Sequence, residues 1–217
     1  MESATRAALA SISYKNIEYR ETLRKAILDR LLLASDILIE YTVQAIQDWI
    51  GPDLAQLNDF TTFFDLVSHS DRRIQTGALF SLKQRISNRE YQESLEKANV
   101  IFLIRSLASD GNSPEAISFV AFALPSLALT LAHNGHVDVI LQLLTHEEPQ
   151  IRQGASAAIE GIANGSAHER KHLLDEDILE RLVGSLGQTE LSCTVIPKLA
   201  QDYLRAGKVD LVITLVE

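Results

Sequence analysis

Apolar residues recur along this chain at the three- and four-residue spacing of helices, in runs separated by short polar turns. Two runs open on nearly the same residues, Gln-Thr-Gly-Ala at 75–78 and Gln-Gly-Ala at 153–155. Aligning Gly77 with Gly154 gives a separation of 154 − 77 = 77 residues, and one more copy fits between them. The period is therefore about 38 residues, which is typical of helical pairs stacked into an α-solenoid.

The pattern after residue 52 alternates between a shorter helix and a longer one. The shorter helices are expected near 53–68, 99–109, 137–146 and 176–187, and their longer partners near 71–88, 113–134, 148–164 and 189–206. Equivalent core positions of the longer helices are occupied by Leu82, Leu124, Ile159 and Leu199. A last segment, 208–217, begins another pair.

The segment before residue 52 is also helical by pattern. Residues 16–50 contain no Gly or Pro and keep apolar helical spacing up to Gly51-Pro52, where we expect the helix to end. It is one long helix or two joined near Ser35-Asp36. We therefore expect residues 1–52 to form an N-terminal helical extension packed on the solenoid, and residues 53–217 to form one continuous set of repeats.

Three stretches resemble armadillo and HEAT repeats. Residues 167–175, Ala-His-Glu-Arg-Lys-His-Leu-Leu-Asp, and 178–186, Ile-Leu-Glu-Arg-Leu-Val-Gly-Ser-Leu, resemble the first and second helices of an armadillo repeat. Residues 148–163 resemble the third helix, and Ile151-Arg152 within them is HEAT-like. The resemblance covers residues 53–217. It implies an all-α, right-handed solenoid of about four repeats with an extra N-terminal helical pair, and a role in binding a protein or peptide.

The chain departs from the family at the positions that bind peptides. The resemblance implies a ladder of Asn with a nearby Trp on each third helix. The matching residues here are Gln84, Ser126, Gly161 and Gln201 for Asn, and Phe80, Phe122, Ala157 and Pro197 for Trp. Because none of these eight is the family residue, peptide recognition of the nuclear-import kind is not expected.

The helix expected at 113–134 has two apolar faces. One holds Val120, Leu124, Leu127 and Leu131 and should pack into the stack, while the other holds Phe122, Pro125, Ser126, Leu129 and His133. If the long helices line the concave side, as the resemblance implies, the second face lines a groove. The residues predicted to bind a partner there are Phe80, Gln84, Phe122, Ser126, Leu129, Gly161 and Gln201. In the alternative, residues 16–50 fold across this face and bury it.

Charge and composition exclude several classes of protein. The net charge is −9, and no run of Lys and Arg is longer than two, so nucleic-acid binding is not expected. A single cysteine, Cys193, and an N-terminus without a secretory pattern favour a reducing, cytoplasmic location. The uncharged stretch 116–134 approaches the length of a membrane span, but Pro125 and its register with amphipathic helices predict a buried solenoid helix and no membrane contact.

One motif carries possible chemistry. Residues 168–172, His-Glu-Arg-Lys-His, match the zinc-protease pattern HExxH, in which two His bind Zn²⁺ and the Glu activates water. They also lie where the armadillo pattern requires a short polar helix. A third ligand could come from Glu176, Glu180 or Glu190, none of which is singled out. His133 and His136 flank Asn134-Gly135 and are expected in solvent at a helix end. We assign no catalytic, cofactor or metal residue from the sequence, and metal binding by His168 and His172 is left open.

The sequence therefore favours a non-enzymatic protein-binding scaffold or adaptor that uses the concave groove. One alternative is an enzyme, either a zinc hydrolase at 168–172 or one acting on a small apolar substrate in the groove. The other is a structural, self-assembling subunit. Residues 211–217, Leu-Val-Ile-Thr-Leu-Val-Glu, are apolar where a polar cap is expected, which predicts a homo-oligomer through the C-terminal end or folding back onto the stack.

Overall fold

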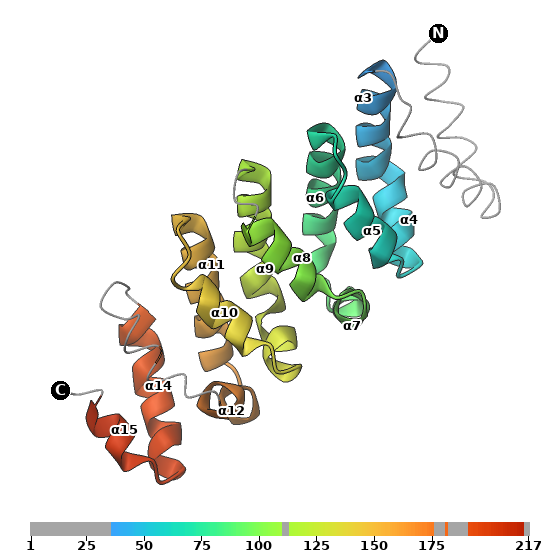
Figure 1. The fold of residues 1–217 in the computed structure, drawn as a ribbon. Coiled ribbons are helices and arrows are strands. Elements are labelled where there is room, and N and C mark those ends of the chain that lie inside the picture. Colours follow the sequence, from blue (N-terminus) through green and yellow to red (C-terminus); the bar gives the residue numbers. More distant parts are fainter. Residues whose placement is uncertain (1–35, 110–112, 176–180, 182–190, 215–217) are drawn as a thin grey trace. The chain divides into compact units, whose positions relative to one another are not determined.

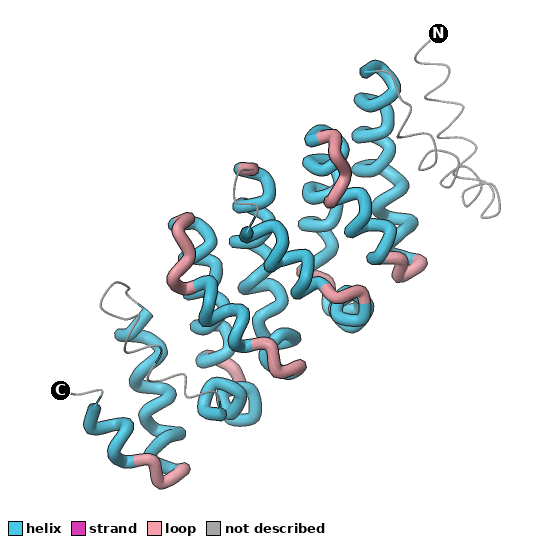
Figure 2. The backbone as a smooth tube through the Cα atoms, viewed as in Figure 1, coloured by secondary structure: helices cyan, strands magenta, loops and turns pink. Residues whose placement is uncertain are grey.

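A computed structural model describes residues 36–109, 113–175, 181 and 191–214, and these form helices joined by short turns, without a strand (Figures 1 and 2). The chain divides into two compact units, Met1–Leu82 and Lys83–Glu217, each of which is described separately. The expected division between residues 52 and 53 stays a prediction.

The first unit is built from helices that share a fully buried apolar core. These helices are α3 (Asp36–Ala45), the π-helical turn η2 (Ile46–Ile50), α4 (Gly51–Gln56), α5 (Phe60–Val67) and most of α6 (Arg72–Ile86). The rings of Phe60 and Phe63 stack with their centroids 6.2 Å apart, and both side chains are completely buried. Asp59 caps α5, because its carboxylate accepts a hydrogen bond from the Thr62 N–H.

The helix end expected at Gly51-Pro52 is wrong. The helical path continues from α3 through η2 and α4 to Gln56. The Gly51 N–H donates to the Ile46 carbonyl, five residues back, and Pro52 occupies the first turn of α4, where its missing N–H costs little. Gly51 is instead explained by close packing, because an added Cβ would overlap the Ser81 Oγ, which donates to Ile46 O at 3.2 Å.

The second unit contains the expected alternation of shorter and longer helices. Its helices are α7 (Arg89–Lys97), α8 (Val100–Ser109), α9 (Pro114–His133), α10 (Val137–Leu143), α11 (Pro149–Ala163), α12 (Ala167–Asp175), α14 (Leu191–Arg205) and α15 (Val209–Thr214). The long helix α11 contacts α9 on one side and α14 on the other. The predicted helix at 176–187 falls outside the described residues except for Arg181.

Helix α7 is not predicted by the apolar spacing. Within Arg89–Lys97, all of which the structure describes, only Leu95 is buried, so there is no apolar stripe to detect. Its start is nevertheless encoded, because the Asn88 side chain accepts a hydrogen bond from the Glu90 N–H at 3.0 Å.

The repeat predicted from the two glycines is confirmed by the packing. Leu82, Leu124, Ile159 and Leu199, placed at equivalent positions by the sequence, are all completely buried. Each of the two glycines faces the preceding long helix. A Cβ at Gly77 would lie 3.0 Å from Val43 Cγ1, and one at Gly154 would lie 2.5 Å from the Ala121 carbonyl oxygen. Glycine therefore allows consecutive long helices to approach closely.

The turns that precede these glycines also repeat. His69 Nδ1 accepts a hydrogen bond from the Asp71 N–H at 2.9 Å, and His146 Nδ1 accepts one from the Glu148 N–H at 3.0 Å. The two histidines are 146 − 69 = 77 residues apart, the same separation as Gly77 and Gly154. The period is thus visible in turn chemistry as well as in helix packing.

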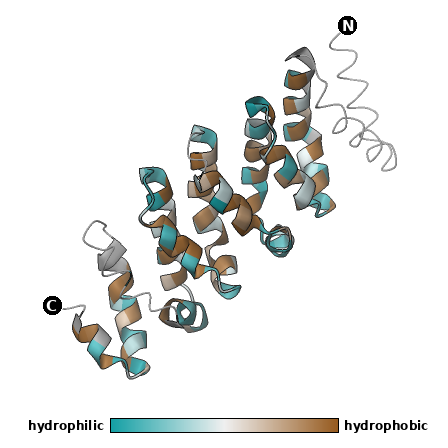
Figure 3. Cartoon of the chain, viewed as in Figure 1, coloured by the Kyte–Doolittle hydropathy of each residue, from teal (hydrophilic) through white to brown (hydrophobic). Residues whose placement is uncertain are grey.

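Among the described residues, α9 is the helix that is long and apolar enough to cross a membrane. Its apolar composition gives it a largely brown colour in Figure 3. It contacts α7, α8, α10, α11 and α12, and its buried side chains form the centre of the second unit. The expectation that this stretch is a core helix of the repeat stack agrees with that packing.

Candidate functional site

One side of α9 is exposed although it is apolar. Phe122 and Leu129 each keep 36% of their surface exposed, Pro125 is exposed and Ser126 is half-buried. The opposite side of the helix, which includes Val120, is buried. We call Phe122, Pro125, Ser126 and Leu129 the α9 face.

The ring of Phe122 lies beside a cation. Lys83, in the last turn of α6, places Nζ 4.9 Å from the centroid of the Phe122 ring. The same Nζ donates to Ser118 Oγ at 3.1 Å, which holds the ammonium group in place. One edge of the α9 face is therefore positively charged.

A polar network joins α7 to the middle of α9. Gln92 Nε2 donates to the Ser126 carbonyl at 3.3 Å, and Gln92 Oε1 accepts from Thr130 Oγ1 at 2.8 Å. Ser126 Oγ donates to the Phe122 carbonyl at 2.8 Å and lies 3.3 Å from Ser87 Oγ. These hydrogen bonds fix the side-chain and backbone positions at the centre of the α9 face.

Pro125 and Gly154 act at the same contact. Pro125 has no N–H, so it cannot donate to the carbonyl of Ala121 one turn earlier. That carbonyl oxygen faces Gly154 of α11 at a distance that leaves no room for a Cβ. The proline inside α9 and the glycine of the repeat signature therefore belong to one helix-to-helix contact.

The other predicted partner-binding residues are also accessible. Gln84, Gly161 and Gln201 are exposed in the second unit, and Phe80 is 52% exposed in the first. Gly161 lies beside α9, since an added Cβ would be 3.9 Å from Ala128 Cβ. The structure thus brings Phe122, Ser126 and Leu129 together on one helix, with Gly161 on the neighbouring one; their role in binding stays a prediction.

The alternative in which residues 16–50 cover this face concerns mainly residues outside the described part. Residues 36–50 form α3 and η2, which belong to the first unit, where Val43 packs beside Gly77 and Ile46 accepts the hydrogen bond from Ser81. Residues 16–35 are not described.

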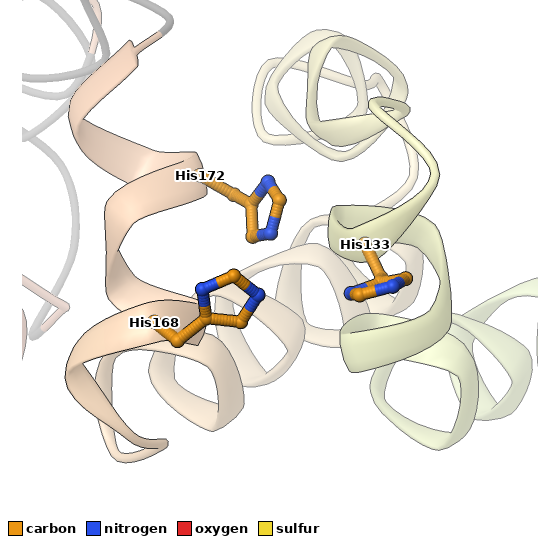
Figure 4. A group of neighbouring side chains, drawn as sticks. All are labelled: His133, His168 and His172. Carbon is orange, nitrogen blue, oxygen red and sulfur yellow. The ribbon is translucent and has the colours of Figure 1, made fainter.

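Three histidines meet at one end of α9. His133 is the last residue of α9, and His168 and His172 lie one turn apart on α12. Figure 4 shows the three rings pointing toward one another between the two helices. Their ring centroids are 5.6 to 6.1 Å apart, and one nitrogen of each ring lies within 4.8 Å of the others.

The end of α9 is fixed by a glycine in the left-handed region. Gly135 has φ 77°, its N–H donates to the Ala132 carbonyl at 3.1 Å, and the His136 N–H donates to the Leu131 carbonyl at 2.8 Å. This is the Schellman arrangement of a helix end. Because α10 begins at Val137, there is no room for a separate first helix between α9 and α10. Helix α12 contacts α9 as well as α11 and α14.

The other residues of the HExxH match have structural roles. Glu169 accepts a hydrogen bond from the Ser166 N–H, and Ser166 Oγ accepts one from the Glu169 N–H, which is a capping box. The backbone hydrogen bond from Ser166 lowers the pKa of the Glu169 carboxyl. Arg170 points away from the histidines, because its guanidinium binds the buried Asp202 of α14 and donates to the Gly165 carbonyl at 2.6 Å.

The sequence alone did not reveal the third histidine. His133 was expected in solvent at a helix end, and the structure does place it, exposed, at the end of α9, but beside His168 and His172. It lies 168 − 133 = 35 residues before His168, so only the repeat spacing could have suggested their proximity. The carboxylates considered as third ligands, Glu176, Glu180 and Glu190, lie outside the described residues.

Comparison with known proteins identifies the fold. No family model matches the sequence, and no curated protein matches it. Among solved structures, a designed armadillo repeat protein in complex with the peptide (KR)4 is 21% identical, covers 91% of each chain and has a TM-score of 0.57. A second designed armadillo repeat protein is 19% identical, with a TM-score of 0.54 over 82% of this chain and 79% of that one. A computationally designed armadillo repeat protein for modular peptide recognition is 16% identical, with a TM-score of 0.50 over 92% of this chain and 87% of that one. The chain therefore has the all-α solenoid fold of armadillo repeat proteins, as the sequence predicted.

Proposed function

We propose that this chain is a non-enzymatic protein-binding scaffold and that the α9 face docks an apolar segment of its partner. The observation that carries the proposal is the exposure of Phe122 and Leu129 on a long helix whose opposite side is fully buried. Designed proteins of the same fold, one of them in complex with a peptide and another made for peptide recognition, support the use of this fold for binding.

The chemistry of the α9 face favours an apolar partner over a basic one. Residues 116–134 contain no Asp or Glu, and the carboxylate of α9, Glu115, lies in its first turn, so the α9 face itself offers no carboxylate to a cationic peptide such as (KR)4. The ammonium group of Lys83 beside Phe122 would also repel a cation. An amphipathic or extended segment with apolar side chains at its contact positions suits this surface better.

The exposed area of Phe122 sets how much binding free energy the Phe122→Asp substitution should remove. An aromatic side chain buries about 200 Å², so the exposed 36% of Phe122 is roughly 70 Å², which corresponds to about 2 kcal/mol when a partner covers it. Placing a carboxylate there removes that gain and adds the cost of burying a charge. Loss of about 2 kcal/mol weakens a complex about 30-fold, which is therefore the least change expected.

The test uses peptides selected from a displayed random library on the full-length chain. Peptides that bind the wild type should bind Phe122→Asp at least about 30-fold more weakly. Phe102→Asp is the matched control, because Phe102 is 69% exposed on a different helix, α8, and this variant should bind as the wild type does.

Far-UV circular dichroism should show equal helicity in the wild type and both variants. Equal binding by Phe122→Asp and the wild type would contradict the proposal, as would an equal loss in Phe102→Asp.

A further inference from the structure

We propose that His133, His168 and His172 form a binding site for one Zn²⁺ ion. Imidazole nitrogens are among the preferred zinc ligands, and three of them with an open fourth position form a recurrent zinc site. Here the three side chains come from two packed helices, and their nitrogens already lie within 4.8 Å of one another.

The geometry needs only a small adjustment to hold the ion. Zn–N distances of about 2.0–2.1 Å with tetrahedral angles place ligand nitrogens about 3.3 Å apart. Starting from separations of at most 4.8 Å, each nitrogen must move by less than about 1 Å, which a change of side-chain torsions supplies. The three rings already face a common point, as Figure 4 shows, so no helix has to move.

His172 gives a second, independent reason. Its Nε2 atom is buried and has no hydrogen-bond partner among the described residues. A buried polar atom without a partner costs about 1–3 kcal/mol. Coordination of a metal ion by this nitrogen would remove that cost.

The guanidinium of Arg170 does not face the three histidines. Arg170, which lies between the two histidines in sequence, is held on the other side of α12 by Asp202. The net charge of −9 also favours cations near the chain.

The site is suited to binding rather than to hydrolysis. In an HExxH enzyme the glutamate activates the water on the metal, but here Glu169 forms the capping box at the start of α12. The three histidines leave a fourth coordination position for water or for a side chain of a bound partner.

The test measures Zn²⁺ binding to the untagged, full-length protein by isothermal titration calorimetry, with bound metal counted by elemental analysis. The wild type should bind one Zn²⁺ per chain. His133→Ala and His172→Ala should each bind at least about tenfold more weakly, because even loss of a group that only orients a ligand costs about that much.

His136→Ala is the matched control. His136 lies near His133 in sequence but pairs with Glu96, with Nε2 3.2 Å from Oε1, so its removal should leave Zn²⁺ binding unchanged. Saturating Zn²⁺ should also raise the unfolding temperature of the wild type and of His136→Ala but not of the two ligand variants.

Failure of the wild type to bind one Zn²⁺, or equal binding by His133→Ala and the wild type, would overturn the proposal. Neither result would affect the peptide-binding proposal, which rests on Phe122 and Leu129.

Discussion

Gly154→Ala tests whether consecutive long helices are in direct backbone contact. A Cβ at residue 154 would lie 2.5 Å from the carbonyl oxygen of Ala121, 2.7 Å from its Cα and 2.9 Å from its carbonyl carbon. All three are backbone atoms, so a change of rotamer cannot relieve the overlap. Ordinary contact begins at 3.4 Å, and α9 and α11 must therefore separate by about 0.9 Å.

The expected loss of stability in Gly154→Ala is the difference between two opposing effects. Inserting a methyl group into a packed contact costs about 1–3 kcal/mol, and overlap with three backbone atoms of Ala121 places this case at the upper end. Alanine gains about 1 kcal/mol over glycine within a helix. The net loss is about 2 kcal/mol, which lowers the unfolding temperature by about 4–8 °C in a chain of this length.

Gly161→Ala provides the control on the same helix. Its added Cβ would meet only Ala128 Cβ at 3.9 Å, an ordinary contact, so helix propensity should raise stability by up to about 1 kcal/mol. Thermal and urea unfolding followed by circular dichroism measure both variants. Shifts in the same direction, or a Gly154→Ala variant as stable as the wild type, would refute the close approach of α9 and α11.

Three further predictions concern helix ends and self-association. Hydrogen bonds from the Arg73 side chain lower the pKa of Asp71 from 3.8 to about 2, and Asp71 also accepts a hydrogen bond from the Arg73 N–H at the start of α6. Asp71→Ala should therefore cost about 1 kcal/mol at pH 7 and progressively less as the pH falls from about 4 to 2. Urea unfolding of the wild type and Asp71→Ala across this pH range measures the difference in stability. A difference that does not change with pH would argue against this prediction. Ser166→Ala should lower stability by about 1 kcal/mol in urea unfolding, while Glu169→Gln, which keeps a capping-box side chain, should change it little; equal losses would show that the cap works differently. If the C-terminal end self-associates, sedimentation should show an oligomer that becomes a monomer when residues 210–217 are deleted, since the deletion removes the exposed Ile213 of α15. A monomer in both cases would exclude self-association.

The repeat architecture could be predicted because its signal is local and recurs. Apolar spacing located the long helices to within a few residues, and the Gly77 and Gly154 alignment gave the correct period. The same reasoning failed at Gly51-Pro52, because a π-helical turn accommodates the proline and the glycine is required by Ser81 of another helix. A glycine is therefore a poor sign of a helix end where close packing against a neighbouring helix requires it.

Of the two candidate sites, one could be predicted from the sequence and the other could not. The exposed face with Phe122 and Leu129 could be predicted, because helical periodicity alone assigns both faces of α9. The histidine cluster could not be predicted, because His133 lies 35 residues before His168 and meets it only through the tertiary contact between α9 and α12. The capping pattern Ser166-x-x-Glu169 was present in the sequence and explains the glutamate of the HExxH match.

Cross-linking of a selected peptide tests the central claim most directly. A peptide selected on the wild type would carry a photoreactive benzophenone side chain, and the cross-linked residues would be located by mass spectrometry. The α9 face and the adjoining part of α11 near Gly161 should carry the cross-links. Cross-links concentrated instead on α8 around the exposed Phe102 would contradict the account.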